Sequence, residues 1–173
     1  AMKSALSNVR RNVIVPNSAN TQLLQRRLLP VWKEFAEENP KYRISLFGYQ
    51  EWMALATELK AQFYALDTYV YSKWWLNPNN AATKQLADTY KYWYNSEMPM
   101  KMPSVPVIGF DSSYFMMKGL AEFGTTFADN LDKVNAKPVQ SFMGYERFNT
   151  WSGFTNQKIG FVHFNKKVVN VEF

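Results

Sequence analysis

Three carboxylates lie where the sequence predicts strand ends, and they are the residues best suited to acid–base chemistry. Glu51, Asp67 and Asp111 each lie close to the end of a predicted strand, where functional sites gather in parallel sheets. Two carboxyl groups at a suitable separation can hydrolyse a glycosidic bond, one as the acid and the other as the base or nucleophile. Carboxylates at such positions also often cap helices. We expect this second role, and therefore predict no catalytic residue.

His163 is the only histidine of the chain, and the sequence contains no cysteine. It alternates with apolar residues in a predicted strand, which favours a structural role over one as metal ligand or general base. One histidine without cysteine supplies no usual zinc ligand set, and thiol catalysis, disulfides and iron–sulfur clusters are excluded. The phosphate-binding motif GxGxxG does not occur. We therefore expect no metal and no cofactor.

The composition is that of a folded domain with a basic surface. Apolar residues make up 47% of the 173 residues and charged residues 20%, while the net charge is +6. The basic residues form no concentrated stripe, so we expect no nucleic-acid partner. No apolar run approaches the length of a membrane span, about 18 residues. Ala1 precedes Met2, and we expect residues 1–12 to be a tag remnant and linker.

Aromatic residues make up 17% of the chain, and four of them are close together in one predicted strand. Tyr69 and Tyr71 would share one face of this strand, and Trp74 would lie on the other face. Trp75 is the last residue of the predicted strand. Large aromatic side chains fill cores efficiently, but they also form platforms for sugar rings. Both interpretations, packing and ligand platform, stay open.

The first third of the chain has the strand–helix–strand pattern of a parallel sheet. The β-branched run at residues 13–15 predicts a buried strand, followed by a helix that Asn20 caps and that Pro30 kinks or splits. A second strand is predicted over residues 43–47. A helix over residues 53–63 and a strand over residues 68–75 follow.

The remainder changes from helical to strand-rich character. Asn80 is predicted to cap one helix, and Asp111 another that ends at Gly124. After Pro138 the pattern predicts strands, the last two of which should pair as a hairpin. Their expected ranges are residues 141–148, 158–164 and 168–173. The chain is thus predicted to be α/β, with parallel strands first and an antiparallel end.

Several sequence blocks, in order, resemble a known family. Val13-Ile14-Val15-Pro16-Asn17-Ser18, Glu37-Glu38-Asn39-Pro40 and the segment from Arg43 to Trp52 are similar to type I periplasmic-binding-protein-like domains. These domains occur in envelope proteins with LysM peptidoglycan-binding modules, and are related to the substrate-binding proteins of amino-acid ABC transporters. Further similar blocks are residues 63–71, 109–120, 142–148, 151–154 and 160–169.

The resemblance implies a partial, three-layer Rossmann-like fold and a place in the periplasm or cell envelope. Residues 13–173 would form the C-terminal portion of the domain. Residues 13–65, approximately, would belong to the second lobe, and residues 66–173 would return to the first. A homodimer through exposed sheet edges is a further expectation. Peptidoglycan would be a partner through a neighbouring domain of the full-length protein.

The resemblance also implies a ligand site after two adjacent parallel strands. Its residues would be Asn17, Ser18 and Asn20 after the first strand, and Tyr49, Gln50 and Glu51 after the second. We expect a small solute or a muropeptide as the ligand, bound without catalysis. The alternatives are a structural, peptidoglycan-associated interaction module without a ligand, and an envelope glycan hydrolase.

Overall fold

The computed structural model describes residues 2–166 and 168–172, and the chain forms two compact units. Unit 1 consists of Ala1–Ser72 and Gly160–Phe173, and unit 2 consists of Lys73–Ile159. The chain therefore leaves unit 1 after Ser72 and returns to it at Gly160. The expected division of lobes near residues 65 and 66 concerns a larger domain and stays a prediction.

A five-stranded mixed sheet forms the centre of unit 1, with the strand order β1-β2-β3-β6-β7. The first three strands run parallel, β6 is antiparallel to β3, and β7 is antiparallel to β6. This arrangement confirms the α/β class, the early parallel strands and the final hairpin. The strands are β1 (Asn12–Ile14), β2 (Ile44–Gly48), β3 (Thr68–Ser72), β6 (Gly160–Asn165) and β7 (Val168–Glu172).

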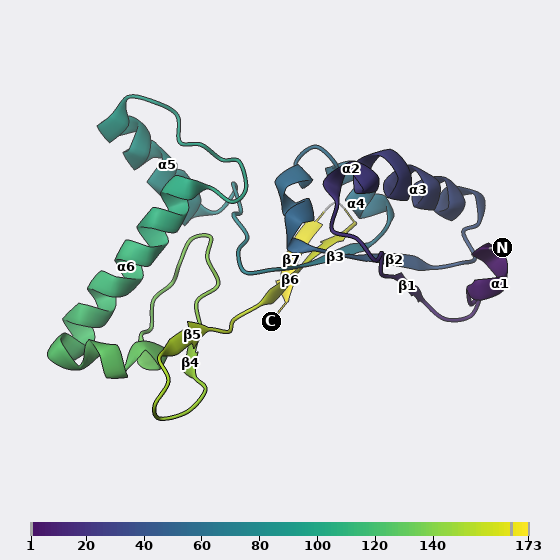
Figure 1. The fold of residues 1–173 in the computed structure, drawn as a ribbon. Helices are drawn as coiled ribbons and strands as arrows, with labels where there is room; N and C mark the ends of the chain where they lie inside the picture. Colours follow the sequence, from purple (N-terminus) through teal and green to yellow (C-terminus); the bar gives the residue numbers. More distant parts are fainter. Residues whose placement is uncertain (1, 167, 173) are drawn as a thin grey trace. The chain divides into compact units, whose positions relative to one another are not determined.

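Helices cover one face of this sheet in unit 1 (Figure 1). Phe63 from the helical face contacts Phe164 of β6 edge-on, with 5.2 Å between ring centroids, and both side chains are fully buried. Such aromatic pairs and the aliphatic side chains around them supply most of the burial free energy. The helical segments are α1 (Met2–Ala5), α2 (Thr21–Leu23), η1 (Leu24–Leu28), α3 (Leu29–Glu38), η2 (Gln50–Leu55) and α4 (Lys60–Ala65).

The first strand is an edge strand and not the buried strand that the sequence predicts. Val13 and Val15 are 58% and 60% exposed, because within the described residues β1 pairs only with β2. A run of β-branched residues is compatible with both positions, so periodicity alone does not distinguish them. β1 therefore presents its outer edge to solvent.

The first long helix is split close to Pro30, as the sequence predicts. A π-helical turn over η1 comes first, and α3 begins at Leu29 with Pro30 in its first turn. Pro30 has no N–H to donate to the carbonyl one turn earlier, and its ring crowds that carbonyl, so the regular α-helical hydrogen bonding is interrupted there. The helix predicted over residues 53–63 is likewise two segments, η2 and α4.

Unit 2 is built on two long helices, α5 (Ala81–Tyr94) and α6 (Val105–Phe123). Asn80 caps α5 through its side chain as predicted, and Gly124 closes α6 with a φ of 55°. α6 begins earlier than predicted, because Pro106 occupies its first turn. Smaller elements follow: η3 (Gly124–Asp129), η4 (Leu131–Lys133) and the antiparallel pair β4 (Tyr145–Arg147) and β5 (Phe154–Asn156).

Candidate functional site

The predicted ligand residues after β1 form a tight polar turn. Ser18 Oγ accepts a hydrogen bond from the Asn20 N–H at 3.2 Å. Asn20 Oδ1 accepts from the N–H groups of Gln22 and Leu23, at 2.9 and 3.0 Å, and so caps α2. Asn17 is exposed in the bend before this turn. Ser18 and Asn20 thus fix the direction in which the chain enters the helix.

Tyr49 joins the turn after β1 to the end of β2. Its hydroxyl donates a hydrogen bond of 2.6 Å to the carbonyl oxygen of Pro16. Its ring contacts the rings of Trp52 and Tyr71, with centroid distances of 5.7 and 6.2 Å. The ends of β1, β2 and β3 are therefore linked through one side chain, at the edge of a parallel sheet where ligand sites usually lie.

Gln50 and Glu51 open η2 directly after β2. Gln50 is half-buried and Glu51 is exposed. Trp52 is fully buried under this turn, and its ring packs against Gly48. A Cβ atom at Gly48 would come within 2.1 Å of the Trp52 ring, so this close approach requires glycine. The structure thus places Asn17 and Ser18 in one turn, and Tyr49 and Gln50 in a second turn that the Tyr49 hydroxyl connects to the first. Glu51 follows in η2 and is exposed.

Asp67 forms a second polar cluster, near the opposite ends of the parallel strands. Its carboxylate accepts a hydrogen bond of 2.5 Å from Ser45 Oγ and lies 2.7 Å from His163 Nε2. Arg11 Nη1 lies 3.4 Å from the same carboxylate. Glu172 Oε1 lies 3.4 Å from the other ring nitrogen of His163. The cluster therefore connects β2, β6 and β7 with the residues that precede β1 and β3.

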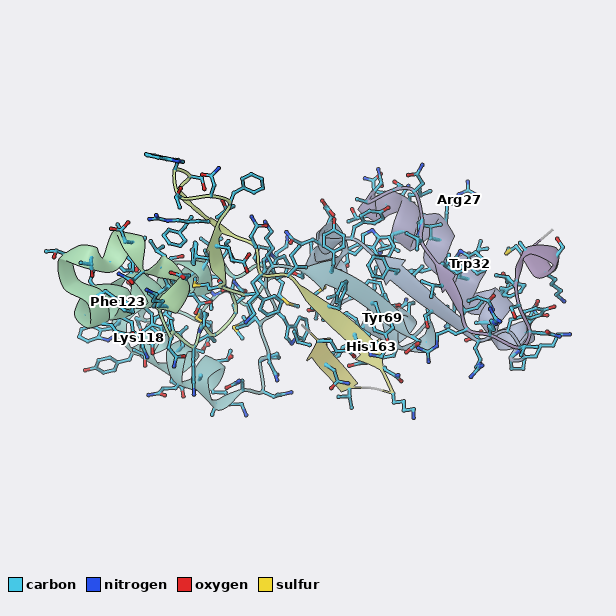
Figure 2. All side chains as sticks on the ribbon, turned by 90° about the horizontal axis from the view of Figure 1, so that it is seen from below. Arg27, Trp32, Tyr69, Lys118, Phe123 and His163 are labelled. Atoms are coloured by element: carbon cyan, nitrogen blue, oxygen red, sulfur yellow. The ribbon has the colours of Figure 1, made fainter. Side chains whose placement is uncertain are left out.

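This cluster links side chains of neighbouring strands and does not have the geometry of a catalytic triad. Ser45 is buried and donates to Asp67 and not to the histidine, so the serine–histidine hydrogen bond of a catalytic triad is missing. The His163 ring stacks on Tyr69 at 3.7 Å and is almost fully buried, which agrees with the structural role predicted for it (Figure 2). The alternation around His163 indicates the strand, but not a partner 96 positions away.

The charge of Asp67 makes unit 1 sensitive to acid. Burial raises the pKa of Asp67, but hydrogen bonds from Ser45 and His163 and the charge of Arg11 outweigh it and lower the pKa below 3.8. A lowered pKa stabilises the folded state above the unfolded value, and this contribution disappears as pH falls through the folded pKa. The contribution of Asp67 to the stability of unit 1 is therefore expected to decline as pH falls below about 3.8.

Asp67→Asn is expected to destabilise unit 1 by about 1–3 kcal/mol at neutral pH and to flatten the loss of stability below pH 3.8. Asparagine tolerates the left-handed backbone at this position, where φ is 47°, so the change removes the charge and one acceptor oxygen without adding backbone strain. Urea unfolding between pH 2 and 7 measures it, with the exposed Glu58→Gln as control. An unchanged pH slope in Asp67→Asn would assign the acid response to other carboxylates.

Asp111 is fully buried within α6 and is not the helix cap that the sequence predicts. Its two oxygens accept hydrogen bonds from three successive backbone N–H groups, those of Val139, Gln140 and Ser141, at 2.6, 2.9 and 2.8 Å. The Gln140 side chain in turn bonds the backbone of Ser104 at both its N–H and its carbonyl. Asp111 thus holds a loop in place, and its oxygens have no access to a substrate.

The described residues contain no group of three or more His, Cys, Asp or Glu side chains that could hold a metal ion. None of their helices is long and apolar enough to cross a membrane. Comparison of the chain with protein-family models, curated proteins and solved structures finds no match. The periplasmic-binding-like family therefore stays a prediction from sequence, while the mixed α/β class is observed.

Proposed function

We propose that the protein is a non-catalytic ligand-binding module whose site lies at the carboxyl ends of β1 and β2. One observation carries the proposal: the hydrogen bond from Tyr49 to the Pro16 carbonyl joins the turns after two adjacent parallel strands. Ligand sites of parallel α/β sheets concentrate at this edge, where backbone groups and side chains from neighbouring loops converge.

The side chains around these turns suit a small polar ligand. Glu51 is exposed and would attract an ammonium group, while Asn17 and Gln50 offer both donors and acceptors. Free amino acids and cell-wall peptides carry such groups. In line with the resemblance in sequence, the proposed ligand is a small solute or cell-wall fragment of the bacterial envelope.

A thermal-shift screen with free amino acids and purified muropeptides tests this function. A ligand at 100-fold excess over its Kd stabilises the folded state by about 2.7 kcal/mol. Glu51→Ala is expected to remove the stabilisation, whereas Glu34→Ala, an exposed acid on α3, is expected to retain it. A ligand that stabilises Glu51→Ala and the unchanged chain equally would place the binding site elsewhere.

A structural role without ligand is the second candidate. Ser18 and Asn20 use their side-chain oxygens to satisfy backbone N–H groups of their own turn. Two of the six predicted ligand residues thus already have a local task, which favours an interaction module. A flat response across the screen supports this candidate. A glycan hydrolase that uses Asp111 is disfavoured, because this side chain is fully buried in unit 2.

A further inference from the structure

A groove between α5 and α6 in unit 2 has the size of a ligand site. The two helices lie beside each other (Figure 1), and two hollows of about 560 and 290 Å³ lie along them. The hollows share Leu86, Thr89 and Phe110, so they adjoin and form one groove. Volumes of this order accommodate small ligands.

Aromatic pairs from both helices line this groove. Tyr90 and Tyr94 of α5 lie 4.6 Å apart between centroids. Phe110 and Tyr114 of α6 lie 6.0 Å apart with their planes within 2° of parallel. Each pair is spaced by four residues, the spacing that brings side chains together on one helix face. Trp93 also lines the groove and is 73% exposed. Large apolar rings exposed together indicate a contact surface.

Gly109 is an exposed glycine in the wall of the groove. It lies in the interior of α6, where glycine costs about 1 kcal/mol relative to alanine. A Cβ atom built on it meets no atom within 4 Å, so no contact within the described chain requires the glycine. It lines the groove together with the aromatic residues. The absent side chain leaves space at this point of the groove wall.

The polar lining restricts the chemistry of the ligand. Gln85, Thr89 and Ser113 contribute one amide and two hydroxyl groups, which both donate and accept hydrogen bonds. Lys137 is the only charged residue among those that line the groove, and none of them is acidic. A complementary ligand has an apolar ring face, several hydroxyl groups and one negative charge.

We infer that the groove between α5 and α6 binds a saccharide that carries a carboxylate group. The C–H face of the sugar ring stacks on the aromatic side chains, the hydroxyl groups bond to the neutral polar residues, and the carboxylate pairs with Lys137. This site is formed by unit 2 alone and does not depend on the site proposed at the end of β2.

Two sugars that differ in one group test this inference. N-acetylmuramic acid has the ring of N-acetylglucosamine with an added carboxylate-bearing substituent. Titration by calorimetry is expected to show that both sugars bind. The acid should bind about two- to fivefold more tightly, because its carboxylate forms an exposed ion pair with Lys137. Lys137→Gln is expected to abolish this preference and to leave the affinity for N-acetylglucosamine unchanged.

Variants of the aromatic wall locate the binding. Trp93→Ala is expected to weaken both sugars about tenfold, since it removes a stacking surface. The matched control is Trp151→Ala, which removes an indole ring of unit 2 that is 95% exposed and does not line the groove. Gly109→Leu is expected to block the groove. Its melting temperature, compared with that of Gly109→Ala, separates blocking from misfolding.

Four results would overturn the inference. They are the absence of binding to either sugar, binding that Trp93→Ala leaves intact, capture by the groove of a proline-rich peptide in place of the sugars, and equal affinity for the two sugars. The last result would remove the assigned role of Lys137 and the preference for a carboxylate. Glu51→Ala is expected to leave sugar binding unchanged, so failure of this site and failure of the proposed function are distinguishable.

Discussion

Asp111→Ala is expected to destabilise unit 2 by about 3 kcal/mol or more, the largest effect of any single charge removal considered for this chain. The substitution leaves the N–H groups of Val139, Gln140 and Ser141 without their acceptor. Each buried donor without a partner costs about 1–3 kcal/mol. A shift of this size lowers the melting temperature of a unit of such length by about 12 °C or more.

Hydrogen exchange followed by mass spectrometry measures this effect within unit 2. Peptides that span residues 137–142 should lose their protection in Asp111→Ala and in Asp111→Asn, because an amide nitrogen cannot accept from the N–H that it faces. Asp129→Ala is the control: it removes an exposed ion pair with Arg147, worth at most about 1 kcal/mol. Retained protection in Asp111→Ala would show that other contacts hold the loop.

Trp52→Ala is expected to destabilise unit 1 by about 3–5 kcal/mol, as is usual for a large buried aromatic side chain. The ring is fully buried, lies against Gly48 and supports the ring of Tyr49. Its loss creates a cavity under the turn that carries Gln50 and Glu51. We therefore expect the hydrogen bond between Tyr49 and Pro16 to weaken as well, and any ligand affinity at this edge to fall.

A milder substitution separates the volume of Trp52 from its polar group. Trp52 Nε1 is buried without a hydrogen-bond partner among the described residues, so Trp52→Phe loses volume but no hydrogen bond. It should cost clearly less than Trp52→Ala in urea unfolding. Trp151→Ala, at a position that is 95% exposed, should change stability by less than about 0.5 kcal/mol. Equal costs for Trp52→Phe and Trp52→Ala would mean that the stabilisation comes from the part of the indole ring that phenylalanine lacks.

The sequence predicts those elements whose signal is local. The β-branched run at residues 13–15 locates β1, the asparagine before Ala81 locates the start of α5, and the turn after Asn165 locates the final hairpin. The prediction of a buried β1 is wrong, because its burial depends on which strands pair at its other edge. Local patterning contains no information on that pairing.

Contacts between distant residues explain the remaining differences. Asp111 is of a residue type that often caps helices. Its carboxylate instead accepts hydrogen bonds from backbone N–H groups 28 to 30 positions further along the chain. The partners of Asp67 and Tyr49 are similarly remote. The sequence identifies polar residues at strand ends, but which of them meet is determined by the register of the sheet and by the loops that cross it.

The return of the chain at β6 has a consequence for the modular organisation of the protein. Ser72 and Gly160 are paired neighbours in antiparallel strands, so unit 2 is an insertion whose two ends are about 5 Å apart. Such an insertion can be exchanged or removed without cutting the sheet that receives it, because a short hairpin turn can close β3 onto β6. Unit 1 is thus the scaffold that receives the insertion. Unit 2 can be inserted into another protein through its two adjacent ends.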